Sequence, residues 1–381
     1  MNIMMVIVVA SLVATYRENY IYAVPFCLLP ILIRVFFDSR TSLFTFLNIV
    51  LITAFYTEDK FEFIFIQLIA GISTIFSVAD MGKRSKLFTS ALLTFIFYIL
   101  AFIAYNLVNN TASAIYVKQN YINFLISSSC VLFAFPLILI SEKLFGFVSD
   151  FTLLELCDLN SPLLRQLSQK VPGTFQHSLQ VANLAEEACY KIGGNPLLVR
   201  TGAMYHDIGK MNHPRFFTEN QVGEISPHED LQPEESAQII ISHVIEGIEI
   251  AKVNKLPEVI IDFIRTHHGT TLTRYFLHNY KKEHEGEKIN EDLFRYPGPI
   301  PYSKETAILM MADGVEASSR SLKKYDAVSI DELVDRIINH QIDENQFINS
   351  DITFRDIKEV KKIFKKRLMN IYHVRIEYPR V

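Results

Sequence analysis

Seven residues in the C-terminal part of the chain have side chains of the kind that bind divalent metal ions. They are five histidines and two aspartates: His177, His206, Asp207, His243, His267, His268 and Asp313. Taken singly, each is better explained as a buried, hydrogen-bonded side chain or as a charge at a helix end. The question is whether these explanations hold for all seven together.

As a group, the seven residues are poorly explained as structural side chains. Burying an unpaired carboxylate costs on the order of several kcal/mol, and a core with two of them would need an organising charge. A divalent cation supplies that charge. Imidazole and carboxylate ligands without thiolate favour Fe, Mn, Co or Zn over Ca or a cysteine-rich structural zinc.

The stretch MYHDIGKM, residues 204–211, is the centre of this hypothesis. Asp207 can bridge two ions through its two oxygens, and two ions about 3.5–4 Å apart are a common arrangement for phosphoester hydrolysis. Lys210 can place its ammonium on a substrate phosphate, although a solvated surface lysine is the alternative. The sequence therefore predicts a hydrolytic site with two divalent cations, in which His206, Asp207 and Lys210 are catalytic.

Helices must position these residues, because the region after residue 172 has helix-capping and helix-breaking residues and almost no strand-like alternation. The expected helices run from Thr174 to Lys191, from Pro196 to His206-Asp207, from Pro233 onward, from Pro257 to His267-His268, and from a Ser303 cap through Asp313. Each helix carries at least one of the seven residues. Residues 173–381 are therefore predicted to form an all-α domain.

Residues 1–146 differ in composition, with long apolar runs and few charges. Six apolar segments stand out, at 3–15, 20–37, 42–56, 61–79, 87–107 and 121–141. Most approach the roughly 17–25 residues that span a bilayer, so we predict a transmembrane bundle of about six helices. The basic residues Arg34, Arg40, Lys83 and Arg84 place their loops, both chain ends and the hydrophilic domain in the cytoplasm. No charge lies in the middle of a segment, which disfavours a transporter.

Residues 147–172 are predicted to be a linker or coupling segment. Its leucines recur at roughly helical spacing around Pro162. We expect them to pack on the following domain. The alternative, a coupling or dimerisation helix that would make the protein a homodimer, stays open.

Composition limits the partners. Half of the residues are hydrophobic, which agrees with a lipid bilayer as one partner, and the formal net charge is only −4. No basic field favours a nucleic acid polymer. The four cysteines are far apart, so buried free thiols are expected rather than a disulfide scaffold.

The residues His177, His206-Asp207 and Asp313, with the HDIGK stretch, resemble HD-domain metal phosphohydrolases. The chain as a whole is similar to the seven-transmembrane HD phosphodiesterases that hydrolyse cyclic di-AMP. The stretches that carry this similarity are FFDSRTSLF, IAGISTIFS, EKLFGFVSDFTLLEL, PGTFQHSLQVANLAEEA, RTGAMYHDIGKM, ESAQIIISHV, IRTHHGT and YPGPIPYSKETAILMMADGVEA.

The resemblance implies the roles of the residues and the reaction. One metal would be held by His177, His206, Asp207 and Asp313. Asp207 would bridge to a second metal. The other ligands of this second metal are implied to be His243, His267 and His268. The family implies iron or manganese as the metal, a cyclic dinucleotide as the substrate, and linear pApA as the product.

The chain departs from the family at its N-terminus, where it lacks a first helix, an extracytoplasmic domain and one of the seven helices. We therefore expect an N-terminally truncated member. A cyclic di-GMP phosphodiesterase is an alternative, although THHGTTLTRYF lacks the GYP motif of those relatives. A nucleotide-binding receptor without turnover and a regulated transporter are the alternatives from other classes.

Overall fold

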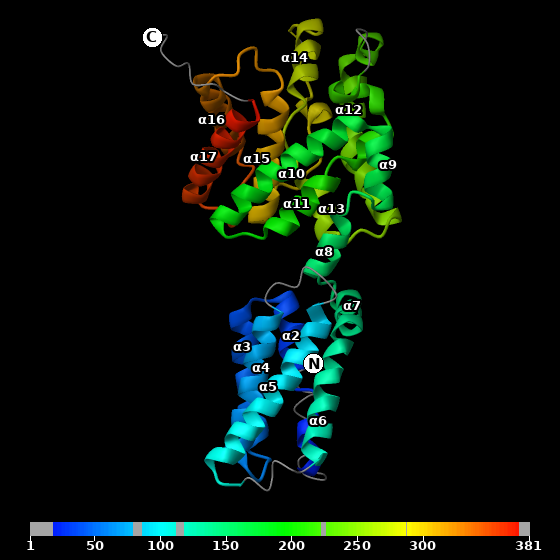
Figure 1. The fold of residues 1–381 in the computed structure, drawn as a ribbon. Helices are drawn as coiled ribbons and strands as arrows, with labels where there is room; N and C mark the ends of the chain where they lie inside the picture. Colours follow the sequence, from blue (N-terminus) through cyan, green and yellow to red (C-terminus); the bar gives the residue numbers. More distant parts are fainter. Residues whose placement is uncertain (1–17, 79–85, 112–117, 222–225, 287, 373–381) are drawn as a thin grey trace, which may run out of the picture. The chain divides into compact units, whose positions relative to one another are not determined.

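The computed structural model describes residues 18–78, 86–111, 118–221, 226–286 and 288–372. The chain divides into two compact units, Met1–Thr152 and Leu153–Val381 (Figure 1). The described residues form helices, and β-pairing among them is limited to an isolated antiparallel bridge between Leu272 and Arg295. The prediction of an all-α fold is confirmed.

The first unit consists of apolar helices. They are η1 (Glu18–Ala23), α2 (Leu28–Phe36), α3 (Ser39–Ala54), α4 (Lys60–Ser77), α5 (Lys86–Val108), α6 (Lys118–Ser129), η3 (Cys130–Phe133) and α7 (Ala134–Phe145). Three helical stretches of the described chain are long and apolar enough to cross a membrane: α4, α5 and the continuous run Lys118–Phe145. They correspond to the last three of the six predicted segments.

The other predicted segments are shorter or lie elsewhere. Segment 42–56 becomes α3, which has 16 residues. Segment 20–37 is not one regular helix, because the chain breaks at Pro25 between η1 and α2, and proline has no N–H to continue a helical ladder. Segment 3–15 lies outside the described residues.

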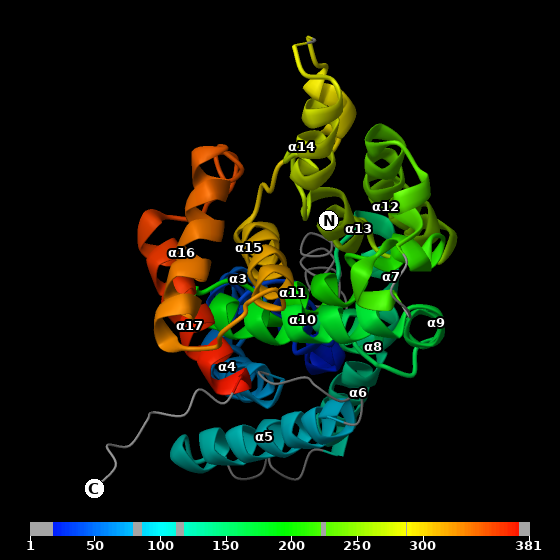
Figure 2. The same ribbon diagram turned by 90° about the horizontal axis from the view of Figure 1, so that it is seen from above.

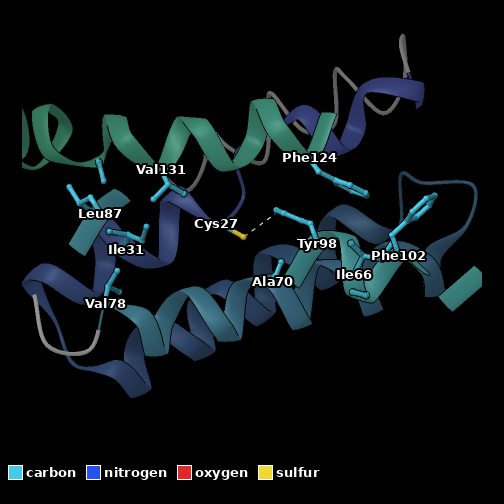
Figure 3. Close-up of a cluster of buried hydrophobic side chains, with 12 residues drawn as sticks. Cys27, Ile31, Ile66, Ala70, Val78, Leu87, Tyr98, Phe102, Phe124 and Val131 are labelled. Atoms are coloured by element: carbon cyan, nitrogen blue, oxygen red, sulfur yellow. Dashed lines mark hydrogen bonds between the residues drawn. The ribbon is translucent and has the colours of Figure 1, made fainter. Parts of the chain in front are cut away.

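The apolar interior of this unit also contains polar side chains, and many apolar side chains lie on its surface. Figure 3 shows Cys27 and Tyr98 among buried hydrophobic residues, with the Cys27 Sγ 3.2 Å from the Tyr98 Oη. The Tyr98 hydroxyl donates to the Gln67 Oε1 at 2.8 Å. By contrast, Phe76 and Phe88 are 75% and 69% exposed. This distribution is what helices in a lipid environment require, because polar groups must find partners within the protein.

The second unit holds ten helices among the described residues, with short 3₁₀ turns between them. They are α8 (Asp150–Leu156, which crosses the boundary between the units), α9 (Pro162–Lys170), α10 (Pro172–Ile192), α11 (Pro196–Tyr205), α12 (Pro233–Val253), α13 (Glu258–Thr266), α14 (Arg274–Glu283), α15 (Lys304–Ser319), α16 (Ala327–Asp343) and α17 (Phe354–Ile371). Helix α10 packs against α11, α15 and α17, and Figure 2 shows it running across the unit. Helices α10, α11 and α15 therefore pack together, and α13 joins α12 to α11 and α15.

Most predicted helix starts agree with the structure, and one is wrong. Pro196 and Pro233 begin α11 and α12, and Ser303 caps α15 through the Thr306 N–H. Thr174 is not a cap. Pro172 occupies the first turn of α10, where proline is favoured, so the helix starts earlier and Thr174 is buried inside it.

The linker leucines are largely buried in this unit. Leu163, Leu164 and Leu167 lie on the buried face of α9, and Leu153 of α8 is buried as well. Leu154 is 37% exposed. The packing that we expected for the leucines of α9 is confirmed.

Candidate metal centre

The structure brings all seven predicted residues to one place in the second unit. His177 lies on α10, His206 and Asp207 follow α11, and His243 lies on α12. His267 and His268 follow α13, and Asp313 lies on α15. Two groups of side chains here have ligand atoms close enough to share an ion: His177 with His206 and Asp207, and His243 with His267 and His268.

The two oxygens of Asp207 face different histidines. Its Oδ2 lies 3.2 Å from the His206 Nε2 and 3.6 Å from the His177 Nε2. Its Oδ1 lies 3.4 Å from the His243 Nε2 and 3.6 Å from the His267 Nε2. Asp207 therefore stands between two sets of imidazole nitrogens.

Three of the histidines are oriented by their own helices. The Nδ1–H of His206 donates to the Ala203 carbonyl at 2.7 Å, and the Nδ1–H of His267 donates to the Ile264 carbonyl at 2.8 Å. His243 donates in the same way to the carbonyl three residues before it, at 2.5 Å. Each Nε2 is thereby turned toward the centre, and in the neutral ring it carries the lone pair that a metal needs.

Asp313 lies beside both groups of ligands. Its Oδ1 is 3.0 Å from the His177 Nε2 and 3.7 Å from the His206 Nε2. Its Oδ2 is 3.9 Å from the His268 Nδ1. The His268 ring stacks on Tyr296, with 4.2 Å between ring centroids, and this contact limits its orientation.

The charges of these groups are strongly coupled. Burial raises the pKa of Asp207, but the charges of His206 and Lys210 outweigh it and hold that pKa well below its usual range. Burial alone would lower the pKa of His206, yet the Asp207 carboxylate raises it to about 10. Burial lowers the pKa of His267 and of His268, so these two rings are neutral at pH 7. The site thus combines ionised carboxylates with two imidazoles, those of His267 and His268, that are neutral at pH 7, and such groups are donors for divalent cations.

Several polar atoms of the site lack partners among the described residues. The buried His206 Nε2 and Asp207 Oδ1 make no hydrogen bond of ordinary geometry. Such orphaned buried atoms are rare in proteins and need an explanation. Together with the donor set, they fit a centre that holds divalent metal ions.

Lys210 is partly buried, with 12% of its side chain exposed, and it is ion-paired, so it is not the solvated surface lysine of the alternative interpretation. Its Nζ lies 2.8 Å from the Asp207 Oδ2 and 2.9 Å from the Glu219 Oε1. The Thr174 hydroxyl donates to the same Glu219 oxygen at 3.0 Å. The Phe217 ring lies beneath the ammonium, 4.9 Å away. Although burial would lower the pKa of Lys210, the two carboxylates raise it, so the side chain is a permanent cation beside Asp207.

The approach of Asp207 to His243 depends on two glycines. A Cβ on Gly209 would stand 1.8 Å from the His243 carbonyl oxygen and 2.7 Å from the Gly247 nitrogen. The 3₁₀ turn Ile208–Met211, which follows Asp207, therefore packs on the backbone of α12. Only residues without side chains at this contact let the two ligand groups come so close.

A cleft of about 530 Å³ opens beside the centre, and His177, Lys210, His268, Asp313, Arg274 and Arg320 are among its lining residues. The sequence analysis missed Glu219, Glu316 and Arg320. Glu316 lies one helical turn after Asp313, so the helical spacing contained a signal for it. Glu219 lies in a 3₁₀ turn outside the main helices, and its sequence position gives no comparable signal.

Comparison with known proteins agrees with this architecture. The family described as "7TM receptor with intracellular HD hydrolase" matches residues 1–149, and the HD domain family matches residues 174–318. The second unit thus contains an HD domain. The chain belongs to the family of seven-transmembrane receptors with an intracellular HD hydrolase.

Two curated relatives are both named cyclic-di-AMP phosphodiesterase PgpH. The protein from Bacillus subtilis is 38% identical, over 82% of this chain and 44% of the relative. The protein from Listeria monocytogenes is 33% identical, over 99% of this chain and 53% of the relative. The chain therefore spans about half the length of the curated relatives it matches. The crystal structure of the L. monocytogenes PgpH HD domain in complex with cyclic-di-AMP is 45% identical, with a TM-score of 0.54, and covers 57% of this chain and 100% of that chain.

Proposed function

We propose that this chain is a membrane-anchored, two-metal phosphodiesterase that hydrolyses cyclic di-AMP to linear pApA. The observation that carries the proposal is the position of Asp207, whose two oxygens face separate histidine sets. The names of the B. subtilis and L. monocytogenes relatives, and the cyclic-di-AMP bound to the HD domain of the latter, support the choice of substrate.

The residues that would hold the ions follow from their grouping. One ion would be held by His177, His206, Asp207 and Asp313; the other would be held by His243, His267 and His268, with Asp207 shared. When bound, iron or manganese would activate water and stabilise the charge that develops on the phosphate.

The chain's own residues would bind and orient the substrate. The cleft beside the centre is lined by the cations Lys210, Arg274 and Arg320, which suit an anionic dinucleotide. Lys210 is the nearest of these to the ligands, so we assign it to a phosphate oxygen. Both arginines lie at the cleft and are ion-paired, Arg274 with Glu344 and Arg320 with Glu316.

Location and assembly follow from the sequence. Arg34 in the last turn of α2 and Arg40 in the first turn of α3 support a cytoplasmic HD domain on a multi-pass protein of the cell membrane. The alternative of a homodimer stays open, and light scattering of the protein in detergent tests it.

The test uses the full chain in detergent, loaded with Mn²⁺ and offered cyclic di-AMP and cyclic di-GMP separately. We expect pApA from the unaltered protein and none from Asp207→Ala. Faster cleavage of cyclic di-GMP would overturn the substrate assignment and keep the reaction. Bound metal with turnover of neither would favour a nucleotide-binding receptor instead.

A further inference from the structure

His177 differs from the other well-buried histidines of the centre in what holds its Nδ1 atom. His206, His243 and His267 donate Nδ1–H to backbone carbonyls of their own helices. His177 on α10 instead forms a short hydrogen bond from Nδ1 to the Oε2 of Glu316 on α15. The orientation of this ring therefore depends on a carboxylate that lies far away in the sequence.

Glu316 is itself fixed in place. It is only 5% exposed, and its Oε1 accepts hydrogen bonds from the Arg320 Nε at 2.9 Å and from a terminal Arg320 nitrogen at 2.7 Å. One oxygen of the Glu316 carboxylate thus forms an ion pair with Arg320, and the other oxygen faces His177. Asp313 and Glu316 are three residues apart on α15, so both carboxylates lie on one face of the helix and reach the two nitrogens of the same ring.

We infer that Glu316 is a positioning residue for the metal centre, which keeps the proton of His177 on Nδ1 and turns the Nε2 lone pair toward the ion. This inference rests on the proposed function, because it concerns the same centre. A carboxylate that accepts from the far nitrogen of a histidine ligand fixes the ring and raises its basicity. The backbone carbonyls that orient the other three histidines cannot be removed by mutation, whereas Glu316 can.

The test measures metal binding without any turnover. The metal-free full chain in detergent is titrated with Mn²⁺, and free Mn²⁺ is followed by electron paramagnetic resonance. We expect Glu316→Ala to weaken binding at one site about 10- to 100-fold. Glu316→Gln, which has a similar shape and keeps an acceptor for the Nδ1–H, should lose less. Glu305→Gln is the matched control. Glu305 lies on the same helix, but it accepts a hydrogen bond from the Asn195 N–H and does not contact the metal centre.

A double-mutant cycle separates positioning of His177 from a general structural role. In a His177→Ala background, adding Glu316→Ala should change Mn²⁺ affinity no further. If Glu316→Ala weakens Mn²⁺ binding in the His177→Ala background as much as it does alone, the inference is overturned. Unchanged Mn²⁺ affinity in both Glu316→Ala and Glu316→Gln would also overturn it. If Glu316→Ala fails to fold, Glu316→Gln decides. Failure of the unaltered chain to bind Mn²⁺ would instead reject the proposed metal centre.

Discussion

His243 and His267 point their Nε2 atoms at each other across 3.1 Å, although 24 residues separate them in the chain. Both rings donate Nδ1–H to backbone carbonyls, so in the neutral form both facing nitrogens carry lone pairs. Two lone pairs at that distance repel each other. A cation bound by both nitrogens and by the Asp207 Oδ1 would remove this repulsion.

We therefore predict that His243→Ala reduces bound Mn²⁺ from two ions to one per chain, because the second set of ligands loses a member. Elemental analysis after dialysis measures the ratio. His213→Ala is the control, since His213 is 44% exposed and pairs with Glu246. Two retained ions would show that His243 is not a ligand.

Lys210→Met should lower kcat/KM about 10- to 100-fold while the protein keeps both ions. The magnitude corresponds to the loss of one hydrogen bond to a charged group. The measurement pairs initial rates with metal content. Lys365→Met is the matched control, because Lys365 is also ion-paired, with Asp331 and Asp335 on α16. If Lys210→Met loses metal instead, Lys210 acts on Asp207 and not on the substrate.

The Lys210–Glu219 pair should make stability depend on pH. Burial raises the pKa of Glu219, but Lys210 outweighs it and the pKa lies below its usual value. A depressed carboxyl pKa stabilises the fold fully above the unfolded pKa of about 4.3, and this contribution is lost as pH falls through the lower folded value.

We therefore expect the difference in unfolding free energy between the unaltered chain and Glu219→Gln to be largest near neutral pH and to shrink below about pH 4. Unfolding of the HD domain by urea at several pH values measures this difference. A difference that grows on acidification would contradict the pairing.

Gly209→Ala should destabilise the second unit by about 2–3 kcal/mol, because its Cβ would meet the backbone oxygen of His243. Gly247→Ala provides the comparison. Its Cβ would meet the Cγ2 of Ile264 at 2.9 Å, a much longer approach than the 1.8 Å from the Gly209 Cβ to the His243 oxygen, so the loss should be smaller. Equal effects in thermal or urea unfolding would show that the close backbone contact does not decide the packing.

Local sequence determined the secondary structure and the types of ligand. Proline and capping residues marked the starts of α11, α12 and α15 because their effects act within one helical turn. At Thr174 the prediction was wrong because Pro172 already occupies the first turn of α10, and the Thr174 hydroxyl donates to Glu219 instead.

Only the tertiary structure decided which atoms face which. The seven residues could be named from their types, but the assignment of one Asp207 oxygen to His206 and the other to His243 depends on how α12 packs on the Gly209 turn. Glu219 was missed for the same reason, and the helical spacing from Asp313 signalled Glu316 but not its partner. Their partners, His177 and Lys210, are reached through space, and side-chain pairing between distant segments is set by packing and not by spacing along the chain.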